Sequence, residues 1–306
     1  MTEYRAKDIV AFLASNGRTS SIRGDENHIW NHAQSILSCN HRSVCFLRTS
    51  SDLWNDGRIE FKGVILVSSQ MLRLKGLTVL VNQDATYIAT DEPELDFYLV
   101  LIHFLKAPVN KLIDSRSIVE IGAVIPQTSS IGPLSYISHD VVLGDNVVIG
   151  VGCVIRNCKI EDDVEIQDGV KIGSDALGAI KDQSGKWLDR PSLAGVLVGR
   201  NCRIEANTVI QSGFLQHTHI HQNVRVGPNT CIGNGVNVGE GGLIGQSVVI
   251  AGSVKIGSDV RLWGNCSIRD GVQIGNNIIV GMGSAVLSDL VVPGIYIGSP
   301  ARILDR

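Results

Sequence analysis

Aliphatic residues return every six positions along the chain from about residue 119 onward. The first run comprises Val119, Ile125, Ile131, Ile137, Leu143, Ile149 and Ile155, and it resumes one residue early at Ile160, Ile166 and Ile172. The second run comprises Ile220, Val226, Ile232, Val238, Ile244, Ile250, Ile256, Leu262, Ile268, Ile274 and Val280. This period fits neither an α-helix nor an ordinary strand and is typical of a hexapeptide β-helix. The spacing therefore predicts a mainly β fold, a parallel β-helix over the later part of the chain.

A unit of six residues is long enough for one short strand and one sharp corner. Three such units close a triangular coil whose aliphatic side chains point inward, and each coil stacks on the one before it. Glycine often follows the aliphatic residue, where the corner needs a positive φ or a close approach of two backbones. The alternative, a conventional β-sandwich, predicts alternation with a period of two, which this region does not show.

The six-residue period is interrupted for a long stretch once, over residues 173–195. The interruption is rich in Gly, Ser, Asp and Pro, so we expect a loop that leaves the coil and returns to it. Trp187 is its most prominent side chain. Two interpretations remain open, that Trp187 contacts a substrate or that it pins the loop onto a neighbouring coil.

Residues 1–106 lack the period and predict a small α/β domain, so we place the domain boundary near Lys106 and assign 107–306 to the β-helix. Aliphatic bursts over residues 61–69 and 76–82 predict two strands. Residues 91–105 open with acidic residues and repeat apolar positions at helical spacing, which predicts a helix.

Composition narrows the possible functions. A net charge of -3 provides no basic surface for a nucleic-acid backbone, so we expect no nucleic-acid partner. The N-terminal segment does not read as a signal peptide, and no apolar run approaches the length of a membrane span. The sequence therefore predicts a cytoplasmic protein without a membrane span.

The seven cysteines form no CxxC pair and therefore indicate neither a disulfide framework nor a zinc site. Cys153, Cys202 and Cys266 each stand two positions before an inward aliphatic residue. A small apolar side chain fits that position, so we expect these cysteines to be structural.

The repeat resembles that of the left-handed β-helix acyltransferases, and the left hand is taken from this resemblance. Members of that group are homotrimers with active sites between adjacent subunits, which implies a homotrimer here. The order of parts, a small N-terminal domain, a helix and a β-helix with one loop, is similar to the UDP-3-O-acylglucosamine N-acyltransferases of lipid A synthesis. The most specific stretch is GSDALGAIKDQSGKWLDRPSLAGVLVGRNCRIEANTVI.

In that family two aromatic residues of the N-terminal domain hold the uracil ring of the substrate. The resemblance implies this role for Phe46 and Trp54, although their spacing is stretched by two residues. An aromatic pair can stack on the faces of a base. The alternative interpretation places Phe46 in the core, because it lies in an apolar run.

The chain departs from the family at the catalytic histidine, because the matching segment CIGNGVNVG places Asn234 at that position. An amide cannot accept a proton near neutral pH, so the usual general base is missing there. Asn234 can instead orient the sugar. His139 also stands two positions after an aliphatic residue, but in an early coil, and we expect it to be a surface residue.

The segment FLQHTHIHQNV holds His217, His219 and His221. No carboxylate or cysteine pattern accompanies them, so we predict no metal site. An imidazole titrates near neutral pH and can take a proton from an attacking amine. His217 is the predicted catalytic base, with His219 and His221 as candidate substrate contacts; the alternative for each is a solvated surface histidine.

The C-terminal segment VVPGIYIGSPARILDR is similar to that of sugar acetyltransferases that use acetyl-CoA. In those enzymes glycine-rich coils accommodate the pantetheine arm, which implies a cofactor-binding role for Gly281 and Gly283. Gly245 and Gly252 are further candidates, since their backbone N–H groups can stabilise a developing oxyanion. The alternative is that the segment only caps the solenoid.

These observations predict an N-acyltransferase that uses acetyl-CoA or another acyl-CoA and acts on a nucleotide-linked amino sugar for a surface polysaccharide such as lipopolysaccharide. A second hypothesis is the lipid A step itself, with an acyl carrier protein thioester as donor. A third is a catalytically silent β-helix that binds a nucleotide sugar.

Overall fold

The computed structural model describes residues 2–47, 62–70, 85–105 and 112–304. The chain divides into two compact units, Met1–Val109 and Asn110–Arg306. Each unit has its own hydrophobic core.

The N-terminal unit contains a five-stranded sheet in the order β2-β7-β6-β5-β4. The four strands from β4 to β7 run parallel, and β2 runs antiparallel to β7. The strands are β2 (Ser20–Arg23), β4 (His32–Ala33), β5 (Ser43–Leu47), β6 (Gly63–Ser68) and β7 (Ala85–Thr90). A two-stranded sheet pairs β1 (Tyr4–Arg5) with β3 (Ile29–Trp30), and a single 3-10 turn, η1, covers Ile36–Ser38.

Two helices, α1 (Ala6–Ser15) and α3 (Pro93–Phe104), pack their apolar residues against one face of this sheet. The predicted helix over 91–105 is confirmed by α3, which has Pro93 in its first turn and acidic residues beside it, as a helix N-terminus favours. The strand predicted over 61–69 is confirmed by β6. The strand predicted over 76–82 lies outside the described residues.

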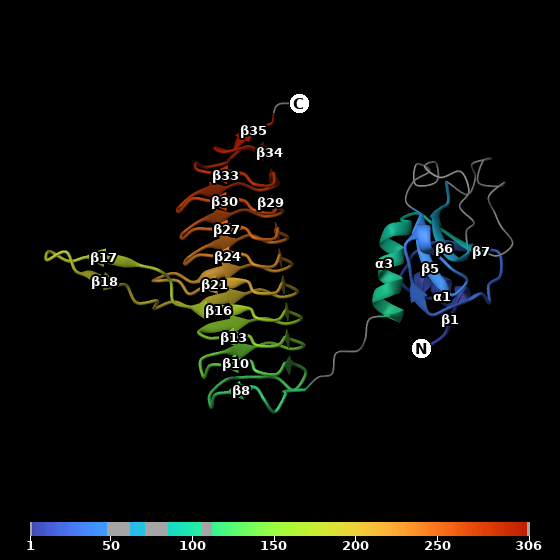
Figure 1. Cartoon of the computed structure of the whole chain (residues 1–306), viewed down its shortest axis with the longest axis horizontal. Helices are drawn as coiled ribbons and strands as arrows, with labels where there is room; N and C mark the ends of the chain where they lie inside the picture. The colour runs from blue at the N-terminus through green and yellow to red at the C-terminus, as the bar shows by residue number, and fades with distance from the viewer. Residues whose placement is uncertain (1, 48–61, 71–84, 106–111, 305–306) are drawn as a thin grey trace. The chain divides into compact units, whose positions relative to one another are not determined.

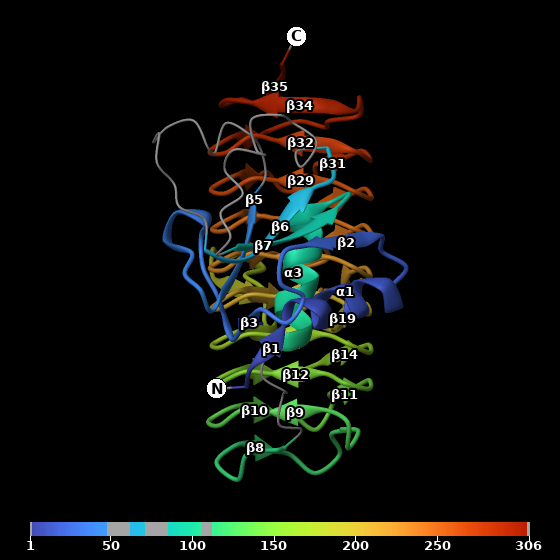
Figure 2. The ribbon, with the colours of Figure 1, turned by 90° about the vertical axis from the view of Figure 1, so that its right-hand side faces the viewer.

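The C-terminal unit is a parallel β-helix, which confirms the fold predicted from the six-residue period. Its coils stack one above another, and successive strands of a coil lie in three different sheets (Figures 1 and 2).

Each sheet is a ladder of short strands, one from almost every coil. The nine-stranded sheet contains β8 (Ile118–Val119), β10 (Tyr136–Ile137), β13 (Val154–Ile155), β16 (Lys171–Ser174), β21 (Val209–Gln211), β24 (Cys231–Ile232), β27 (Val249–Ile250), β30 (Ser267–Ile268) and β33 (Ala285–Val286). The seven-stranded sheet contains β11 (Val142–Leu143), β14 (Cys158–Ile160), β19 (Val196–Val198), β22 (Thr218–Ile220), β25 (Asn237–Val238), β28 (Lys255–Ile256) and β31 (Gln273–Ile274). The ten-stranded sheet contains β9 (Ser130–Ile131), β12 (Val148–Ile149), β15 (Glu165–Ile166), β20 (Arg203–Ile204), β23 (Arg225–Val226), β26 (Leu243–Ile244), β29 (Arg261–Leu262), β32 (Ile278–Val280), β34 (Gly294–Ile297) and β35 (Arg302–Ile303).

The inward positions are those predicted from the repeat. Every aliphatic residue of the two runs from Ile131 to Val280 is buried, whereas Val119 and Ile125 in the first coil are partly exposed. Identical side chains stack in register, as Ile232 does on Ile250. The residues two positions earlier fill the rest of the interior, and Cys153, Cys202 and Cys266 are buried there as unpaired thiols, as predicted.

At the corners, close backbone approach and positive φ fall on different residues, although the sequence pattern suggested one glycine for both. The glycine directly after an inward aliphatic residue is required by close backbone approach: a Cβ at Gly239 would lie 2.5 Å from the carbonyl carbon of Gly257. The positive φ falls two residues later, at Gly241 or at residues such as Ser247, Asp259 and Asn265. Asn and Asp tolerate this left-handed conformation better than most residues, which explains why glycine is not needed there.

Two of the three edges of the β-helix flank the nine-stranded sheet. The hairpin corner follows the strands of the nine-stranded sheet and comprises residues 173–195, 212–217, 233–236, 251–254 and 269–272. The tryptophan corner precedes those strands and comprises residues 205–208, 227–230, 245–248, 263–266 and 281–284. The nine-stranded sheet therefore lies between the two corners.

Candidate active site

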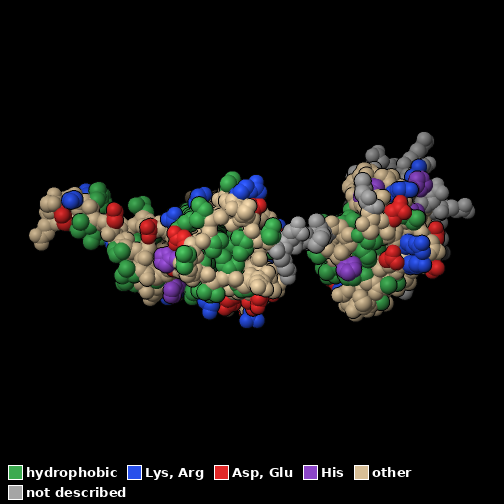
Figure 3. Space-filling view, turned by 90° about the horizontal axis from the view of Figure 1, so that it is seen from below, with side chains coloured by type: hydrophobic (Ala, Val, Ile, Leu, Met, Phe, Trp, Pro, Cys, Tyr) green, Lys and Arg blue, Asp and Glu red, His purple; other side chains and the backbone are tan. Residues whose placement is uncertain are grey.

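The predicted loop over 173–195 leaves the β-helix at the hairpin corner as an antiparallel hairpin of β17 (Ala179–Lys181) and β18 (Trp187–Asp189). It stands out from the coils and carries hydrophobic side chains among charged ones (Figures 1 and 3). Trp187 is 62% exposed, and the ammonium group of Lys181 lies 4.8 Å from the centre of its ring. Trp187 therefore does not pin the hairpin to a coil and is available for contact with another molecule.

The base of the hairpin is fixed by the next coil. Leu193 and Ala194 donate backbone hydrogen bonds to the carbonyl oxygens of Phe214 and Gly213, at 2.9 and 3.1 Å. The Arg190 guanidinium lies 4.4 Å from the centre of the Phe214 ring, a cation–π contact. A Cβ at Gly178 would collide with the same ring. Phe214 is thus the anchor on which the hairpin rests.

A hollow of about 500 Å³ lies at this base, between the outgoing and the returning segments of the hairpin. It is lined by Asp175–Gly178 and Asp189–Ser192. The interrupted six-residue period predicted the loop but not its anchors, Phe214 and Arg190. One feature of the sequence could have indicated Phe214 as an anchor. It is one of few aromatic residues in the chain and lies where the six-residue period is stretched, just before β22.

His217 lies directly beside the returning hairpin and is exposed. Its Nδ1 atom accepts a hydrogen bond from the backbone N–H of Gly195 at 3.0 Å. Because a neutral imidazole has one accepting nitrogen, this bond leaves the proton on Nε2. In this arrangement Nε2 is a hydrogen-bond donor, which favours stabilisation of a negative oxygen over the general-base role that the sequence predicts for His217.

Asn234 occupies the same corner in the next coil. The two coils are tied together by the backbone N–H of Gly235, which donates to the Thr218 hydroxyl at 2.9 Å. Gly252 stacks above Asn234 in the following coil, and a Cβ there would lie 2.8 Å from the Asn234 Oδ1 atom. Successive coils are about 4.8 Å apart, so His217, Asn234 and Gly252 form one short column.

The column offers hydrogen-bond donors rather than a base. The N–H of Gly252 donates to no acceptor among the described residues, whereas the N–H of Gly245 is used in the coil ladder, donating to the Leu262 carbonyl at 2.7 Å. Of the two predicted backbone donors, Gly252 is therefore the one that remains available. Asn234 adds an amide group that can donate as well as accept.

His219 and His221 lie away from the column. His219 points outward from the middle of the seven-stranded sheet, and His221 lies at its far corner. Their rings stack with centroids 3.8 Å apart. Burial lowers the pKa of His219, and the neighbouring His221 lowers it further, so His219 resists taking up a proton. No group of three or more potential metal ligands is found within the described ranges.

The two predicted base-stacking residues belong to the N-terminal unit. Phe46 lies in β5 and packs against α3, with ring centroids 4.9 Å from Phe97 and 6.1 Å from Tyr98. Its side chain is half-buried, so one part of the ring is committed to packing. Trp54 lies outside the described residues.

The remaining cofactor candidates, Gly245, Gly281 and Gly283, lie on the tryptophan corner, across the nine-stranded sheet from Gly252. A Cβ at Gly245 would lie 2.7 Å from the backbone nitrogen of Gly264, and one at Gly281 would lie 2.7 Å from the Ile297 side chain. Gly283 has a positive φ and open space around it. The structure thus divides the predicted glycines between two edges of the prism.

The family models that match the chain lie within the β-helix. The model described as bacterial transferase hexapeptide (six repeats) matches residues 122–157 and 253–288, and that of the hexapeptide repeat of succinyl-transferase matches 191–212. The chain is 25% identical over 245 residues to a UDP-3-O-acylglucosamine N-acyltransferase of Polynucleobacter asymbioticus, covering 71% of this chain and 68% of that protein. It is 33% identical over 147 residues to the probable UDP-3-O-acylglucosamine N-acyltransferase 2, mitochondrial, of Arabidopsis thaliana, about half of each chain (48% and 48%).

Solved structures share the fold. A UDP-N-acetylglucosamine acyltransferase from Campylobacter jejuni superposes with a TM-score of 0.57 at 24% identity, covering 63% of this chain and 74% of that one. The corresponding enzyme from Bacteroides fragilis gives a TM-score of 0.57 at 21% identity, with the same coverage. None of the helices within the described ranges is long and apolar enough to cross a membrane. The matches confirm the predicted resemblance to hexapeptide-repeat acyltransferases and support acyl transfer as the activity.

Proposed function

From this likeness to the hexapeptide-repeat acyltransferases, we propose that the chain transfers an acyl group from an acyl-CoA to the amino group of a nucleotide-linked amino sugar. The observation that carries the proposal is the column at the hairpin corner. There His217, Asn234 and Gly252 present hydrogen-bond donors beside the hairpin that carries the exposed Trp187. The relatives named as UDP-3-O-acylglucosamine N-acyltransferases support a UDP-sugar as the acceptor.

The donor character of the column favours an amine over a hydroxyl as the acceptor. A hydroxyl must lose its proton to a base as it attacks, and neither Asn234 nor the Nε2–H of His217 can accept one. The ammonium group of an amino sugar can have a pKa close to neutral, so a fraction of it is already nucleophilic. The site then has to align the two substrates and stabilise the oxyanion.

The reaction follows from this arrangement. The amine nitrogen attacks the thioester carbonyl carbon, and the carbonyl oxygen takes the negative charge. We assign stabilisation of that oxygen to the Nε2–H of His217, the Asn234 amide and the Gly252 N–H, which the ladder hydrogen bonds leave available. When the intermediate collapses, the carbon–sulfur bond breaks, the nitrogen loses its proton to solvent, and the thiolate leaves. Removal of one such donor typically costs about 10²–10³ in rate.

We assign contact with the sugar to the hairpin corner, through Trp187. His219 and His221, which lie on the seven-stranded sheet away from that corner, are assigned no part in the reaction at the column. Phe46 and Trp54 of the N-terminal unit are proposed, independently of the column, to stack on a nucleobase. Gly245, Gly252, Gly281 and Gly283 are assigned to the acyl-CoA. A homotrimer is part of this proposal, because a single chain leaves the column open to solvent. The protein is proposed to act in the cytoplasm.

The direct test is to incubate the protein with UDP- and dTDP-linked amino sugars and with either acetyl-CoA, longer acyl-CoAs or acyl carrier protein thioesters, and to follow thiol release. We expect turnover with an acyl-CoA and an amino sugar. Turnover only with acyl carrier protein thioesters and a UDP-3-O-acylglucosamine would identify the lipid A step instead. No turnover with any pair would favour a silent sugar-binding protein.

A further inference from the structure

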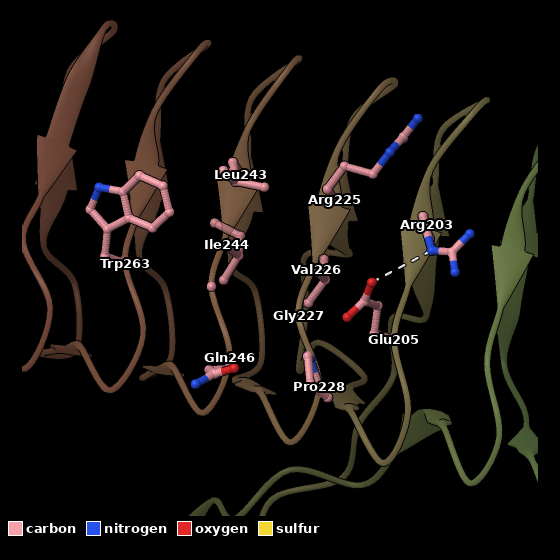
Figure 4. Close-up of a pocket in the computed structure, with 11 residues that line it drawn as sticks. Arg203, Glu205, Arg225, Val226, Gly227, Pro228, Leu243, Ile244, Gln246 and Trp263 are labelled. Carbon is pink, nitrogen blue, oxygen red and sulfur yellow. Dashed lines mark ion pairs between the residues drawn. The ribbon is translucent and has the colours of Figure 1, made fainter. Parts of the chain in front are cut away.

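A second pocket lies on the tryptophan corner and the ten-stranded sheet beside it. It encloses about 220 Å³ and extends over four successive coils, from Arg203 and Glu205 to Trp263 (Figure 4). Coil spacing makes this length about 14 Å along the axis. The pocket is therefore an elongated groove, separated from the candidate active site by the width of the nine-stranded sheet.

The two ends of the groove offer different chemistry. Trp263 is 45% exposed and presents an indole ring at one end, above the bare backbone of Gly245. At the other end Arg203 is neutralised by Glu165 and Glu205, at 2.7 and 3.5 Å.

Arg225 differs from Arg203. Its Nη1 atom donates to the backbone carbonyl oxygens of Asn201 and Val224, and it has no acidic partner within the described residues. Its Nε and Nη2 groups remain available for an anion. An uncompensated guanidinium suits a phosphate group, and an exposed indole suits the face of a flat ring.

Trp263 and Arg225 stand on coils that are two steps apart, about 10 Å. This separation is comparable with the distance between a nucleobase and its phosphates. Gln246, which is exposed between them, supplies an amide that can hydrogen-bond to a base edge or a ribose.

The sheet between the two corners provides a path from this groove to the column. The outward residues of its strands in these coils are Cys231, Val249, Ser267 and Ala285, all small and uncharged. The neighbouring sheets carry larger side chains at these levels, such as Leu243, Arg261 and Lys255. The nine-stranded sheet is thus a smooth surface about six residues wide, roughly 20 Å, over which a slender chain can lie.

We propose that the tryptophan-corner groove binds the nucleotide of the acyl-CoA donor, with Trp263 against the adenine, Arg225 against a phosphate, and the pantetheine arm crossing the nine-stranded sheet to the hairpin corner. This inference rests on the proposed function, which it deepens by naming the donor's binding residues. It also explains why the glycine candidates are split between two edges: Gly245 lines the nucleotide end and Gly252 lies at the thioester end.

Binding of adenosine 3′,5′-bisphosphate, the nucleotide part of CoA, tests the groove without any need for turnover. Isothermal titration of the full chain should show binding that weakens about tenfold or more in Arg225→Ala and in Trp263→Leu, as expected for loss of a charge-assisted hydrogen bond or a ring contact. Arg261→Ala, which removes a positive charge from the same sheet outside the groove, is the matched control and should change affinity less than twofold. Absence of binding to the wild-type chain, or a groove that binds UDP in place of adenosine 3′,5′-bisphosphate, would overturn the proposal.

The path of the arm has its own test. Val249→Trp should raise the KM for acetyl-CoA about tenfold and leave the affinity for adenosine 3′,5′-bisphosphate unchanged, with Lys255→Trp on the adjacent sheet as control. An unchanged KM would overturn the proposed path of the pantetheine arm.

A chain that binds the nucleotide as expected but transfers nothing refutes the proposed function alone. Transfer from acetyl-CoA that is indifferent to Arg225 and Trp263 refutes the inference alone.

Discussion

At the scale of single residues, the hydrogen bond from Gly195 to His217 decides how the candidate site can act. The donor is a backbone N–H, so Nδ1 of His217 must accept, and the proton of the neutral ring resides on Nε2. The bond exists only because the hairpin returns to the coil at Gly195. A Cβ at Gly195 would lie 2.3 Å from the Asn157 carbonyl oxygen, so the position requires glycine.

This geometry predicts the behaviour of His217 variants. His217→Ala should lower kcat/KM about 100-fold through the loss of one oxyanion donor, and His217→Gln, whose amide can donate, should recover part of that loss. The pH profile of kcat/KM should follow the acceptor amine in the wild type and in both variants. A general-base role would be indicated instead by a limb of the wild-type profile that disappears in His217→Ala.

Glu120 makes a pH-dependent contribution to stability in the early coils. Its carboxylate accepts hydrogen bonds from the Tyr136 hydroxyl at 2.6 Å and from the backbone and ring of His139, at 2.9 and 3.0 Å. The Tyr136 bond, followed by those from His139, lowers the pKa of Glu120 to about 2. His139, expected at the surface, is 68% exposed and is held by this carboxylate.

Because the folded-state pKa of Glu120 is below its unfolded value of about 4.3, the stabilisation is present above that value and disappears as the pH falls towards 2. Glu120→Gln should therefore lower the Tm by a few degrees at most at pH 7, and the difference from wild type should shrink between about pH 5 and pH 2. Asp189→Asn, on the exposed hairpin, is a control expected to have no effect. A difference in Tm that stays constant across this range would contradict the account.

At the scale of elements, the hairpin combines exposure with a firm base. The residues from Ala179 to Asp189 are exposed or half-exposed, and the anchoring contacts at Arg190 and Phe214 lie outside that segment. Its function is thus separable from the stability of the coils.

Replacing residues 179–189 by two glycines should leave the Tm within a few degrees of wild type while lowering kcat/KM at least tenfold. Arg190 already bonds to the Gly178 carbonyl, so the shortened turn closes across an existing contact. Trp187→Ala alone should reproduce part of the loss if the indole contacts the sugar. Full activity of the shortened protein would exclude the hairpin from the site.

The sequence predicted these elements unevenly, for physical reasons. Burial of an aliphatic residue at each sixth position is a local requirement, so the coils, their corners and the ejected loop follow from the spacing. Asn234 and Gly252 lie three hexads apart, which places them on one corner. The position of His217 could not be obtained in this way, because the coil from Val209 to Cys231 is longer than three hexads and its extra residues pack on the hairpin.

The six-residue repeat does not predict side-chain contacts between distant segments. The cation–π contact of Arg190 with Phe214, and the groove between Arg225 and Trp263, join residues from different coils whose types follow no period. Phe46 shows the same limit, because its apolar neighbourhood in the sequence indicated the core while its aromatic ring suggested a base-stacking role. It lies in β5, half-buried against α3.

At the scale of the whole molecule, the proposed homotrimer predicts a measurable mass. The hairpin leaves Leu177 89% exposed and Leu188 45% exposed, and Leu215 beside its base is 82% exposed. Apolar side chains gathered in this way are typical of a surface covered by another subunit. Light scattering during size exclusion should give three times the mass of the chain, and a stable monomer at micromolar concentration would contradict the trimer.

The most direct measurement of the proposed activity identifies the product itself. A purified UDP- or dTDP-linked amino sugar is incubated with the protein and acetyl-CoA, and the nucleotide sugar is analysed by mass spectrometry, with the corresponding sugar that carries a hydroxyl in place of the amine as the matched control. The amino sugar should gain one acyl group on nitrogen while the hydroxyl analogue stays unchanged. Acylation of the hydroxyl analogue at a similar rate, or no acylation of any amino sugar, would contradict the proposed activity.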